Sequence, residues 1–315
     1  MLYSGGENAP FIVRQREMIS DRFTIVGLGE IVWDLLPGGP QLGGAPTNFA
    51  YFANLLGNHS VVASRVGADT LGVETLARLQ QSGLPTGYVQ VDDAHATGTV
   101  RVRVDQQGQP DFTISETVAW DFLELTPQWQ ELAGMADAVC FGSLAQRSAA
   151  SRQTIQRFLQ ATRADALRVF DVNLRQAFYS EEVLAASLSR AKVVKLNHQE
   201  LPIVAAMFGV ACGDDEAQAR ALLQAQALEM VCVTRGAHGS LLVSATEAIA
   251  HEGFAVTTAD TVGAGDAFTA ALTHHYLRGA ALAEINQAAN FLGAWVASQI
   301  GATPAVAPGV LKQVI

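Results

Sequence analysis

Residues 260–266 read Asp-Thr-Val-Gly-Ala-Gly-Asp and continue into Ala-Phe-Thr-Ala-Ala-Leu, so two glycines and an acid stand where a loop becomes a helix. Glycines let backbone N–H groups approach an anion closely, and a helix start adds unpaired donors and a partial positive charge. We expect Gly263, Ala264 and Gly265 to form an anion hole and the Asp266 carboxylate to accept a proton from an attacking hydroxyl. This arrangement is typical of phosphoryl transfer. The alternative for Asp266 is an N-cap role in the helix.

A second group of polar residues lies near the start of the chain. Asp34 belongs to a β-rich run, and Gly43 and Gly44 lead through Thr47 to Asn48 on a predicted helix. Paired glycines let a polyol lie against the backbone, while a carboxylate and an amide offer the groups that bind vicinal hydroxyls. We interpret these residues as sugar contacts. The alternatives are that Thr47 only caps the helix and that Asp34 only stabilises a turn.

Other phosphate-binding and hydrolytic motifs are absent from the sequence. A Walker A loop requires Gly-Lys before Ser or Thr, and no lysine here follows a glycine. The first β-rich run leads to Gly27, Gly29 and Glu30, which lacks the third glycine of a dinucleotide fingerprint and continues into another β-rich run. There is no His-Glu-x-x-His or Gly-x-Ser-x-Gly segment. These observations argue against P-loop, dehydrogenase, metalloprotease and α/β-hydrolase chemistry.

Composition and charge favour a small-molecule ligand. The net charge is −10 and the chain has only three lysines, so the basic footprint that nucleic acid or an anionic membrane requires is missing. Cys140, Cys212 and Cys232 are too widely spaced to chelate zinc and suit a structural role in a reducing compartment. Residues 1–22 lack the apolar core of a secretion signal. We therefore expect a soluble, cytoplasmic protein.

The elements that must position the polar residues follow from alternating sequence patterns. Short valine-rich runs predict buried strands at residues 24–28, 60–66, 136–141, 167–172, 191–196 and 230–234. Helical periodicity predicts helices at residues 47–56, 71–81, 148–162, 215–226, 266–277 and 282–299. Strands and helices in alternation imply an α/β fold, a doubly wound parallel sheet in which ligands gather beyond the carboxyl ends of the strands.

One segment departs from this alternation. Residues 97–104 alternate valines with Arg101 and Arg103, residues 105–109 turn, and residues 111–115 run back, which predicts an antiparallel hairpin. With residues 34–42 it is expected to form a small antiparallel β lid, a homodimer contact, or both. The remaining prediction is one domain, residues 23–315, preceded by a flexible N-terminal arm, residues 1–22, in which Met18 is an alternative translation start.

Taken together, these motifs resemble the ribokinase-like (PfkB) family of sugar and nucleoside kinases, closest to the fructokinases. The similarity in order and spacing runs from residue 23 to residue 305, and the 260–266 signature is its most specific part. The other matching segments are Gly43-Gly44 with Asn48, then Gly67, Asp69 and Gly72, Asn197 with Glu200, Thr234 with Gly236 and Gly239, and Gly301-Ala302. The resemblance implies transfer of the γ-phosphoryl group of Mg-ATP to a sugar hydroxymethyl group.

The resemblance also implies roles for individual residues. Asp266 is the implied catalytic base. Asn197 and Glu200 match an Asn-x-x-Glu motif that positions magnesium and the triphosphate, with Glu200 reaching Mg²⁺ through water. A potassium or other monovalent ion, bound by carbonyls near the 260–266 loop and the end of the chain, is a further implied cofactor.

The nucleotide contacts are implied by three further positions. Thr234, Gly236 and Gly239 match the family's loop against the phosphates and ribose, although Arg235 replaces the apolar residue often found there. Asn290 stands where the family frequently contacts adenine; the alternative is an ordinary asparagine on a helix surface.

The choice of sugar depends on residues 170–175, Phe-Asp-Val-Asn-Leu-Arg, which resemble the Asp-x-Asn-x-Arg segment of fructokinases and 2-keto-3-deoxygluconate kinases. Arg175 would hold a sugar oxygen or the transferred phosphoryl group; a salt bridge with a neighbouring acid is the alternative. Ribokinases commonly carry a glutamate near the position occupied here by Ala145 or Arg147. The absence of that glutamate weakens a ribose assignment. We expect D-fructose to become fructose 6-phosphate, with 2-keto-3-deoxygluconate kinase, ribokinase, nucleoside kinase and an inert regulatory homologue as alternatives.

Overall fold

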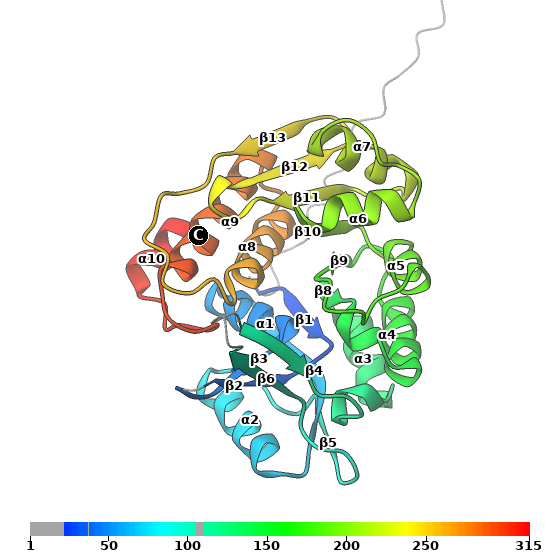
Figure 1. Ribbon diagram of the computed structural model, residues 1–315, viewed down its shortest axis with the longest axis vertical. Coiled ribbons are helices and arrows are strands. Elements are labelled where there is room, and N and C mark those ends of the chain that lie inside the picture. Colours follow the sequence, from blue (N-terminus) through cyan, green and yellow to red (C-terminus); the bar gives the residue numbers. More distant parts are fainter. Residues whose placement is uncertain (1–21, 37, 105–109) are drawn as a thin grey trace, which may run out of the picture.

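A nine-stranded sheet forms the centre of the structure, a computed structural model that describes residues 22–36, 38–104 and 110–315 (Figure 1). The predicted arm, residues 1–22, and Met18 lie outside the described residues except for Arg22. In pairing order the strands are β13 (Ala248–His251), β12 (Ser240–Ser244), β11 (Met230–Thr234), β10 (Val193–Asn197), β9 (Leu167–Asp171), β8 (Ala138–Gly142), β1 (Thr24–Leu28), β4 (His59–Gly67) and β5 (Val89–Asp92).

The direction of pairing confirms the predicted doubly wound α/β sheet. All pairs from β11 to β5 are parallel, and they contain each of the six predicted strands. At one edge, β12 pairs antiparallel with both β11 and β13, an addition that the sequence analysis did not predict. The carboxyl ends of the parallel strands therefore share one edge of the sheet, where a ligand site is expected.

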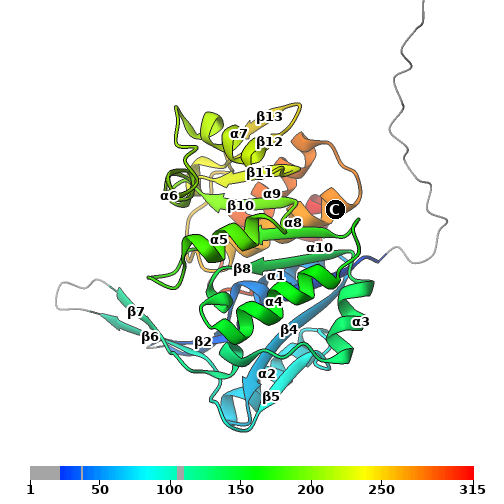
Figure 2. The ribbon, with the colours of Figure 1, turned by 90° about the vertical axis from the view of Figure 1, so that its right-hand side faces the viewer.

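Helices cover both faces of this sheet (Figures 1 and 2). One face carries α1 (Ala45–Leu55), α2 (Thr70–Gln81), α8 (Ala264–Leu277), α9 (Leu282–Ala297) and α10 (Pro308–Val314). The other carries α3 (Pro127–Met135), α4 (Ala149–Ala161), α5 (Glu181–Leu188), α6 (Glu200–Met207) and α7 (Asp215–Ala225). None of the helices in the described ranges has the length and apolarity to cross a bilayer.

Strand residues alternate between two apolar cores, one on each face. Ile25 and Val169 pack into the core beneath α1 and α8, whereas Val26 and Phe170 pack into the core beneath α4. Both faces are buried, which explains why the strands read as continuous apolar runs. The six predicted helices are present, but α3, α5, α6 and α10 were missed because two turns or so give little periodicity.

A second sheet projects from the carboxyl-terminal edge of the first (Figure 2). Its order is β3 (Gly39–Gly43), β2 (Val32–Leu36), β6 (Thr99–Val104) and β7 (Pro110–Ile114). The predicted β6–β7 hairpin is antiparallel, as is the β2–β3 hairpin, and the two hairpins are joined by a parallel pair, β2 with β6. The described parts of the segments predicted as a lid, residues 34–42 and 97–115, thus meet in one sheet. The predicted turn at residues 105–109 lies outside the described residues, and the action of this sheet as a lid stays a prediction.

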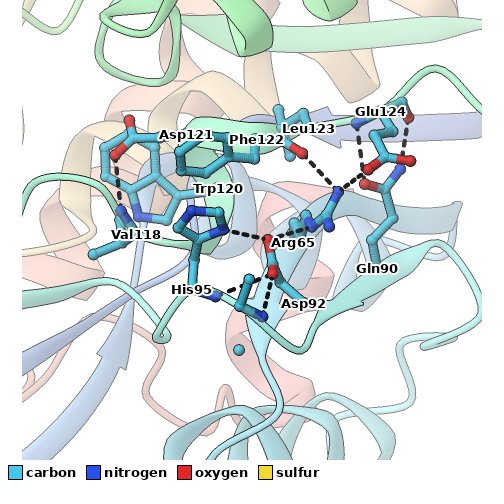
Figure 3. Close-up of polar contacts among 12 residues, drawn as sticks. Arg65, Gln90, Asp92, His95, Val118, Trp120, Asp121, Phe122, Leu123 and Glu124 are labelled. Atoms are coloured by element: carbon cyan, nitrogen blue, oxygen red, sulfur yellow. Dashed lines mark hydrogen bonds and ion pairs between the residues drawn. The ribbon is translucent and has the colours of Figure 1, made fainter.

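Ion pairs hold the segments that join the β6–β7 hairpin to the central sheet (Figure 3). Asp92, at the end of β5, contacts Arg65 of β4 at 2.9 Å and His95 at 3.0 Å. Arg65 also contacts Glu124 at 2.6 Å and donates to the Phe122 carbonyl oxygen at 2.7 Å. The rings of His95 and Phe122 stack with centroids 3.7 Å apart. The base of the hairpin is therefore attached to the central sheet on both sides.

Candidate active site

Helix α8 begins inside the 260–266 segment. Its N-cap is Gly263, whose φ is 79°, and a Cβ there would lie 2.2 Å from the Ala302 carbonyl oxygen. Only glycine suits this position, because the left-handed conformation strains other residues and the backbone of the chain end leaves no room. Asp266 lies in the first helical turn, so the alternative that it is the N-cap is wrong. The Ala264 N–H donates to the Thr261 carbonyl oxygen at 3.3 Å, which makes Gly263 and Gly265 the better anion-hole donors.

Asn48 and Asp266 contact each other although they are 218 residues apart: Asn48 Nδ2 donates to Asp266 Oδ2 at 2.8 Å. Asn48 is buried in the first turns of α1, which lies beside α8 (Figure 1). The N-cap of α1 is Gly44, with φ 106°, so the alternative that Thr47 caps this helix is also wrong. This hydrogen bond therefore connects the two groups of residues that the sequence predicted separately.

Two of the predicted sugar contacts, Asp34 and Gly43, lie on adjacent strands of the second sheet. The register partner of Asp34 on β3 is Gln41, and the Asp34 side chain approaches Gly43, where a Cβ would lie 3.0 Å from Asp34 Oδ2. Burial raises the pKa of Asp34, Asp260 raises it further, and Arg175 lowers it. The side chain of Arg175 is exposed, and its Nη1 donates to the Leu174 carbonyl oxygen at 3.0 Å.

Both acidic and basic groups surround Asp266. Burial raises the pKa of Asp266 to about 6; Asp171 raises it as well, whereas the Asn48 hydrogen bond, Lys195 and Arg175 lower it. Burial also raises the pKa of Glu30, which follows β1, to about 7. A carboxylate whose pKa lies near neutral pH is suited to accept and release a proton.

Asp171 and Lys195 lie beneath this site, and the sequence analysis assigned a role to neither. The Lys195 Nζ atom is 3.1 Å from both carboxylate oxygens of Asp171. A Cβ at Gly265 would lie 3.0 Å from the same Nζ atom, so the ammonium group lies directly under the helix start. The sequence contained one indication of this ion pair, a lysine within the otherwise apolar run Val-Val-Lys-Leu. Buried lysines are rare unless they are paired with an acid.

Asn197 and Glu200, the residues predicted to position magnesium and the triphosphate, lie at the end of β10 and the start of α6. Asn197 Oδ1 accepts the Glu200 N–H at 2.9 Å, and Glu200 Oε2 accepts the Asn197 N–H at 2.9 Å. Glu200 Oε1 accepts the Leu174 N–H at 2.8 Å, which connects this motif to the segment that carries Arg175. Asn197 is also the register partner of Thr234 at the end of β11, so the two predicted nucleotide segments are adjacent.

The loop after β11 needs its glycines. Gly236 and Gly239 have φ values of 58° and 74°, and a Cβ at Gly239 would lie 1.9 Å from the His251 carbonyl oxygen. Arg235, which departs from the family pattern, pairs with Asp215 at 3.0 Å. The backbone of this loop is thus held in a conformation in which few other residues would fit.

Asn290 on α9 is buried in a polar cluster. Its Nδ2 atom donates to Ser240 Oγ at 2.7 Å and lies 2.9 Å from Asn286 Oδ1, so it is not an ordinary surface asparagine. The predicted adenine contact stays a prediction, and these bonds show that the amide nitrogen already has protein acceptors.

The comparisons identify the class of enzyme. The profile of the pfkB family carbohydrate kinases matches residues 39–308, and the chain belongs to this family. The fructokinase of Salmonella typhimurium is 34% identical over 257 residues, which cover 78% of this chain and 81% of that protein. The protein is accordingly a phosphotransferase that acts on an alcohol group of a sugar, with fructokinases among its relatives.

Two solved structures show the same fold with ligands. The fructokinase of Vibrio cholerae O395 in its fructose, ADP and calcium ion bound form has a TM-score of 0.77 at 26% identity, covering 94% of this chain and 99% of that one. A double mutant of that fructokinase in its fructose, ADP and potassium ion bound form has a TM-score of 0.77 at 25% identity, with the same coverage.

Proposed function

We propose that this kinase transfers the γ-phosphoryl group of Mg-ATP to D-fructose and forms fructose 6-phosphate. The observation that carries the proposal is the hydrogen bond between Asn48 and Asp266. It joins a residue predicted to bind the sugar hydroxyls to the carboxylate predicted to accept the proton. The fructokinase relatives support fructose as the sugar. In this proposal Asp34, Gly43, Gly44, Asn48 and Arg175 bind the sugar.

The reaction is an in-line displacement. The sugar hydroxyl oxygen forms a bond to the γ-phosphorus while the bond from that phosphorus to the bridging oxygen of ADP breaks, and the hydroxyl proton passes to Asp266. Asn48 orients the Asp266 carboxylate, and the first-turn N–H groups at Gly263 and Gly265 face the charge on the phosphoryl group. Positioning and charge neutralisation supply most of the rate enhancement.

The side chains near the predicted nucleotide site fit a magnesium ion that is bound mainly by the nucleotide. Within the described part of the chain, no three His, Cys, Asp or Glu side chains cluster as a metal site. Magnesium keeps several waters and takes one or two carboxylates together with substrate phosphates. We assign Glu200 as the carboxylate that reaches the ion through water, and Asn197, Thr234, Gly236, Gly239 and Asn290 as nucleotide contacts.

A potassium site near the end of the chain is part of the proposal. Gly301 N–H donates to Asp260 Oδ2 at 3.2 Å, and the Ala302 carbonyl oxygen approaches Gly263, so the backbones of the two segments lie close together. The potassium-bound form of the Vibrio cholerae fructokinase supports this assignment.

The second sheet acts as the lid in this proposal. It carries Asp34, so its closure would bring a sugar contact over the site and exclude water before transfer. A homodimer contact through the same sheet, in place of the lid role or together with it, is the alternative, and light scattering of the purified protein tests whether a dimer forms. We place the enzyme in the cytoplasm, where ATP is available and where the free thiols Cys140, Cys212 and Cys232 stay reduced.

The test is ADP release on mixing with ATP, magnesium and a panel of fructose, ribose, 2-keto-3-deoxygluconate and nucleosides. We expect the highest kcat/KM with fructose, and a ³¹P spectrum of the product that shows the 6-phosphate. A higher kcat/KM with another member of the panel would replace fructose as the substrate. ADP release with no member of the panel would favour the inert regulatory homologue.

A further inference from the structure

We propose that the buried Asp171–Lys195 ion pair is a positioning element for Asp266: it fixes the first turn of α8 on the central sheet, and the Lys195 ammonium favours the ionised carboxylate of Asp266. This inference rests on the proposed function, in which Asp266 is the base. The pair lies on adjacent parallel strands, β9 and β10, where Asp171 and Lys195 are register partners.

The pair connects the sheet to the start of the helix. Asp171 Oδ2 contacts Lys195 Nζ and also accepts the Thr269 hydroxyl at 3.2 Å. The same Thr269 hydroxyl lies 2.9 Å from the Gly265 carbonyl oxygen, one turn earlier in α8. Gly265 leaves just enough space above Lys195 for this contact, because a Cβ would lie 3.0 Å from Nζ. The position of the first helical turn therefore depends on the ion pair.

Lys195 supplies a buried positive charge near Asp266. Burial lowers the pKa of Lys195, but the charges of Asp171, Glu200 and Asp266 together outweigh it and raise the pKa overall, so Lys195 stays protonated. The other cation, Arg175, is exposed and hence better screened by water. The groups that face Asp266 from the surrounding elements are Asn48 from α1, Glu30 after β1, Cys140 from β8, Asp171 from β9, Arg175 from the following segment and Lys195 from β10.

Asp171 and Lys195 contact each other, and they shift the pKa of Asp266 in opposite directions. The Asp171 carboxylate raises the pKa of Asp266, and the Lys195 ammonium lowers it. Burial holds the Cys140 thiol neutral by raising its pKa, so it adds no charge. An ion pair without electrostatic coupling to Asp266 would leave its titration unchanged when one member is neutralised, whereas a pair coupled to Asp266 shifts it in a direction that depends on which member is removed.

The experiment measures the titration of Asp266 directly in the full chain. Carboxyl-¹³C NMR, assigned with Asp266→Asn, is recorded against pH for the wild type, Asp171→Asn and Lys195→Met, together with the pH profile of kcat/KM for fructose. Lys192→Met is the matched control, because Lys192 precedes the same strand at the end away from the site and contacts Glu229 at 3.5 Å. Circular dichroism establishes that each variant is folded.

We expect the midpoint of Asp266, and with it the acidic limb of kcat/KM, to fall by about one pH unit in Asp171→Asn and to rise by about one unit in Lys195→Met. Lys192→Met should leave both unchanged. If Lys195→Met fails to fold because Asp171 is left unpaired, Asp171→Asn decides, since it keeps the shape of the side chain and retains Lys195.

Unchanged midpoints in the folded variants, or a rise in Asp171→Asn, would overturn the inference. The NMR titration needs no turnover, so it separates this inference from the proposed function. A wild-type protein without kinase activity would remove the function while the coupling of the three side chains could still be measured.

Discussion

At the scale of single residues, the proposed chemistry depends on how the Asp266 carboxylate is oriented and charged. Asn48 donates to one of its oxygens at 2.8 Å, and the glycines before it keep side chains away from the helix start. Burial and Asp171 raise the pKa of Asp266 to about 6. The carboxylate is therefore ionised at neutral pH yet basic enough to take a proton during transfer.

Asp266→Asn should lower kcat by about 10²–10⁴-fold, the usual contribution of a general base. The amide keeps the shape of the side chain, so ATP and fructose should still bind with affinities close to those of the wild type by calorimetry. Asp93→Asn, a change at an exposed acid, is the control and should retain full activity. Near-normal turnover of Asp266→Asn would remove this residue from the role of base.

Asp34→Ala should raise the KM for fructose far more than the KM for ATP, because Asp34 lies on the second sheet beside Gly43 and away from the predicted nucleotide segments. Initial rates measured with each substrate varied in turn provide the comparison. Equal increases in both KM values would show that the sugar pocket is elsewhere.

At the scale of elements, Asp69 joins helix α2 to the base of the second sheet. As the N-cap of α2 it accepts the Gly72 N–H at 2.8 Å, and it also accepts the Thr97 N–H at 2.8 Å and the Thr97 hydroxyl at 2.7 Å. Thr97 lies two residues before β6. Burial raises the pKa of Asp69, but the hydrogen bonds from Thr97 and Gly72 outweigh it and the pKa is lowered overall.

Asp69→Ala should reduce the free energy of unfolding by about 1–2 kcal/mol through loss of the cap, and should raise the KM for fructose because Thr97 is released. Asp214→Ala is the matched control: Asp214 caps α7 by accepting the Ala217 N–H at 3.0 Å, far from the second sheet in the fold. Urea unfolding and steady-state kinetics test both variants. An equal change of KM in the two variants would contradict a link between Asp69 and the sugar site.

At the scale of the whole molecule, His274 makes stability depend on pH. It lies buried on α8, where its Nδ1 is 3.1 Å from Asn58 Nδ2 and its Nε2 has no hydrogen-bond partner among the described residues. Burial, with smaller contributions from Arg278 and His275, lowers its pKa from 6.5 to about 3. The unfolded chain therefore binds a proton below pH 6.5 that the folded chain does not bind until about pH 3, so stability is lost as the pH falls through this range.

His274→Gln should weaken this dependence, because glutamine cannot be protonated. For the wild type we expect the His274 contribution to reduce the free energy of unfolding by roughly 2 kcal/mol between pH 7 and pH 5. Urea unfolding at the two pH values measures the loss, with the exposed His59→Gln as the control. A loss of the same size in His274→Gln and in the wild type would assign the acid sensitivity to other groups.

The sequence alone determined features that depend on local conformation. The valine-rich runs form the parallel strands, as predicted. Gly44 and Gly263 have positive φ and lie close to neighbouring backbone. They are the N-caps of α1 and α8, whose starts the sequence patterns predicted to within three residues. The short helices α5 and α6 were not predicted because about two turns give little periodicity. The antiparallel edge of the sheet was not predicted because its form depends on packing against neighbours.

Only the tertiary structure decided which residues of the site meet. The Asn48–Asp266 bond joins residues 218 apart in the chain, and the Asp171–Lys195 pair joins residues 24 apart. Both contacts exist because the strand order brings β9 beside β10 and places α1 beside α8. Local patterns predict strands and helices but not their order, since the pairing energy comes from burying both faces of the complete sheet. For that reason Lys195 appeared in the sequence as one residue of a buried run, and its position beneath the active site emerged only from the fold.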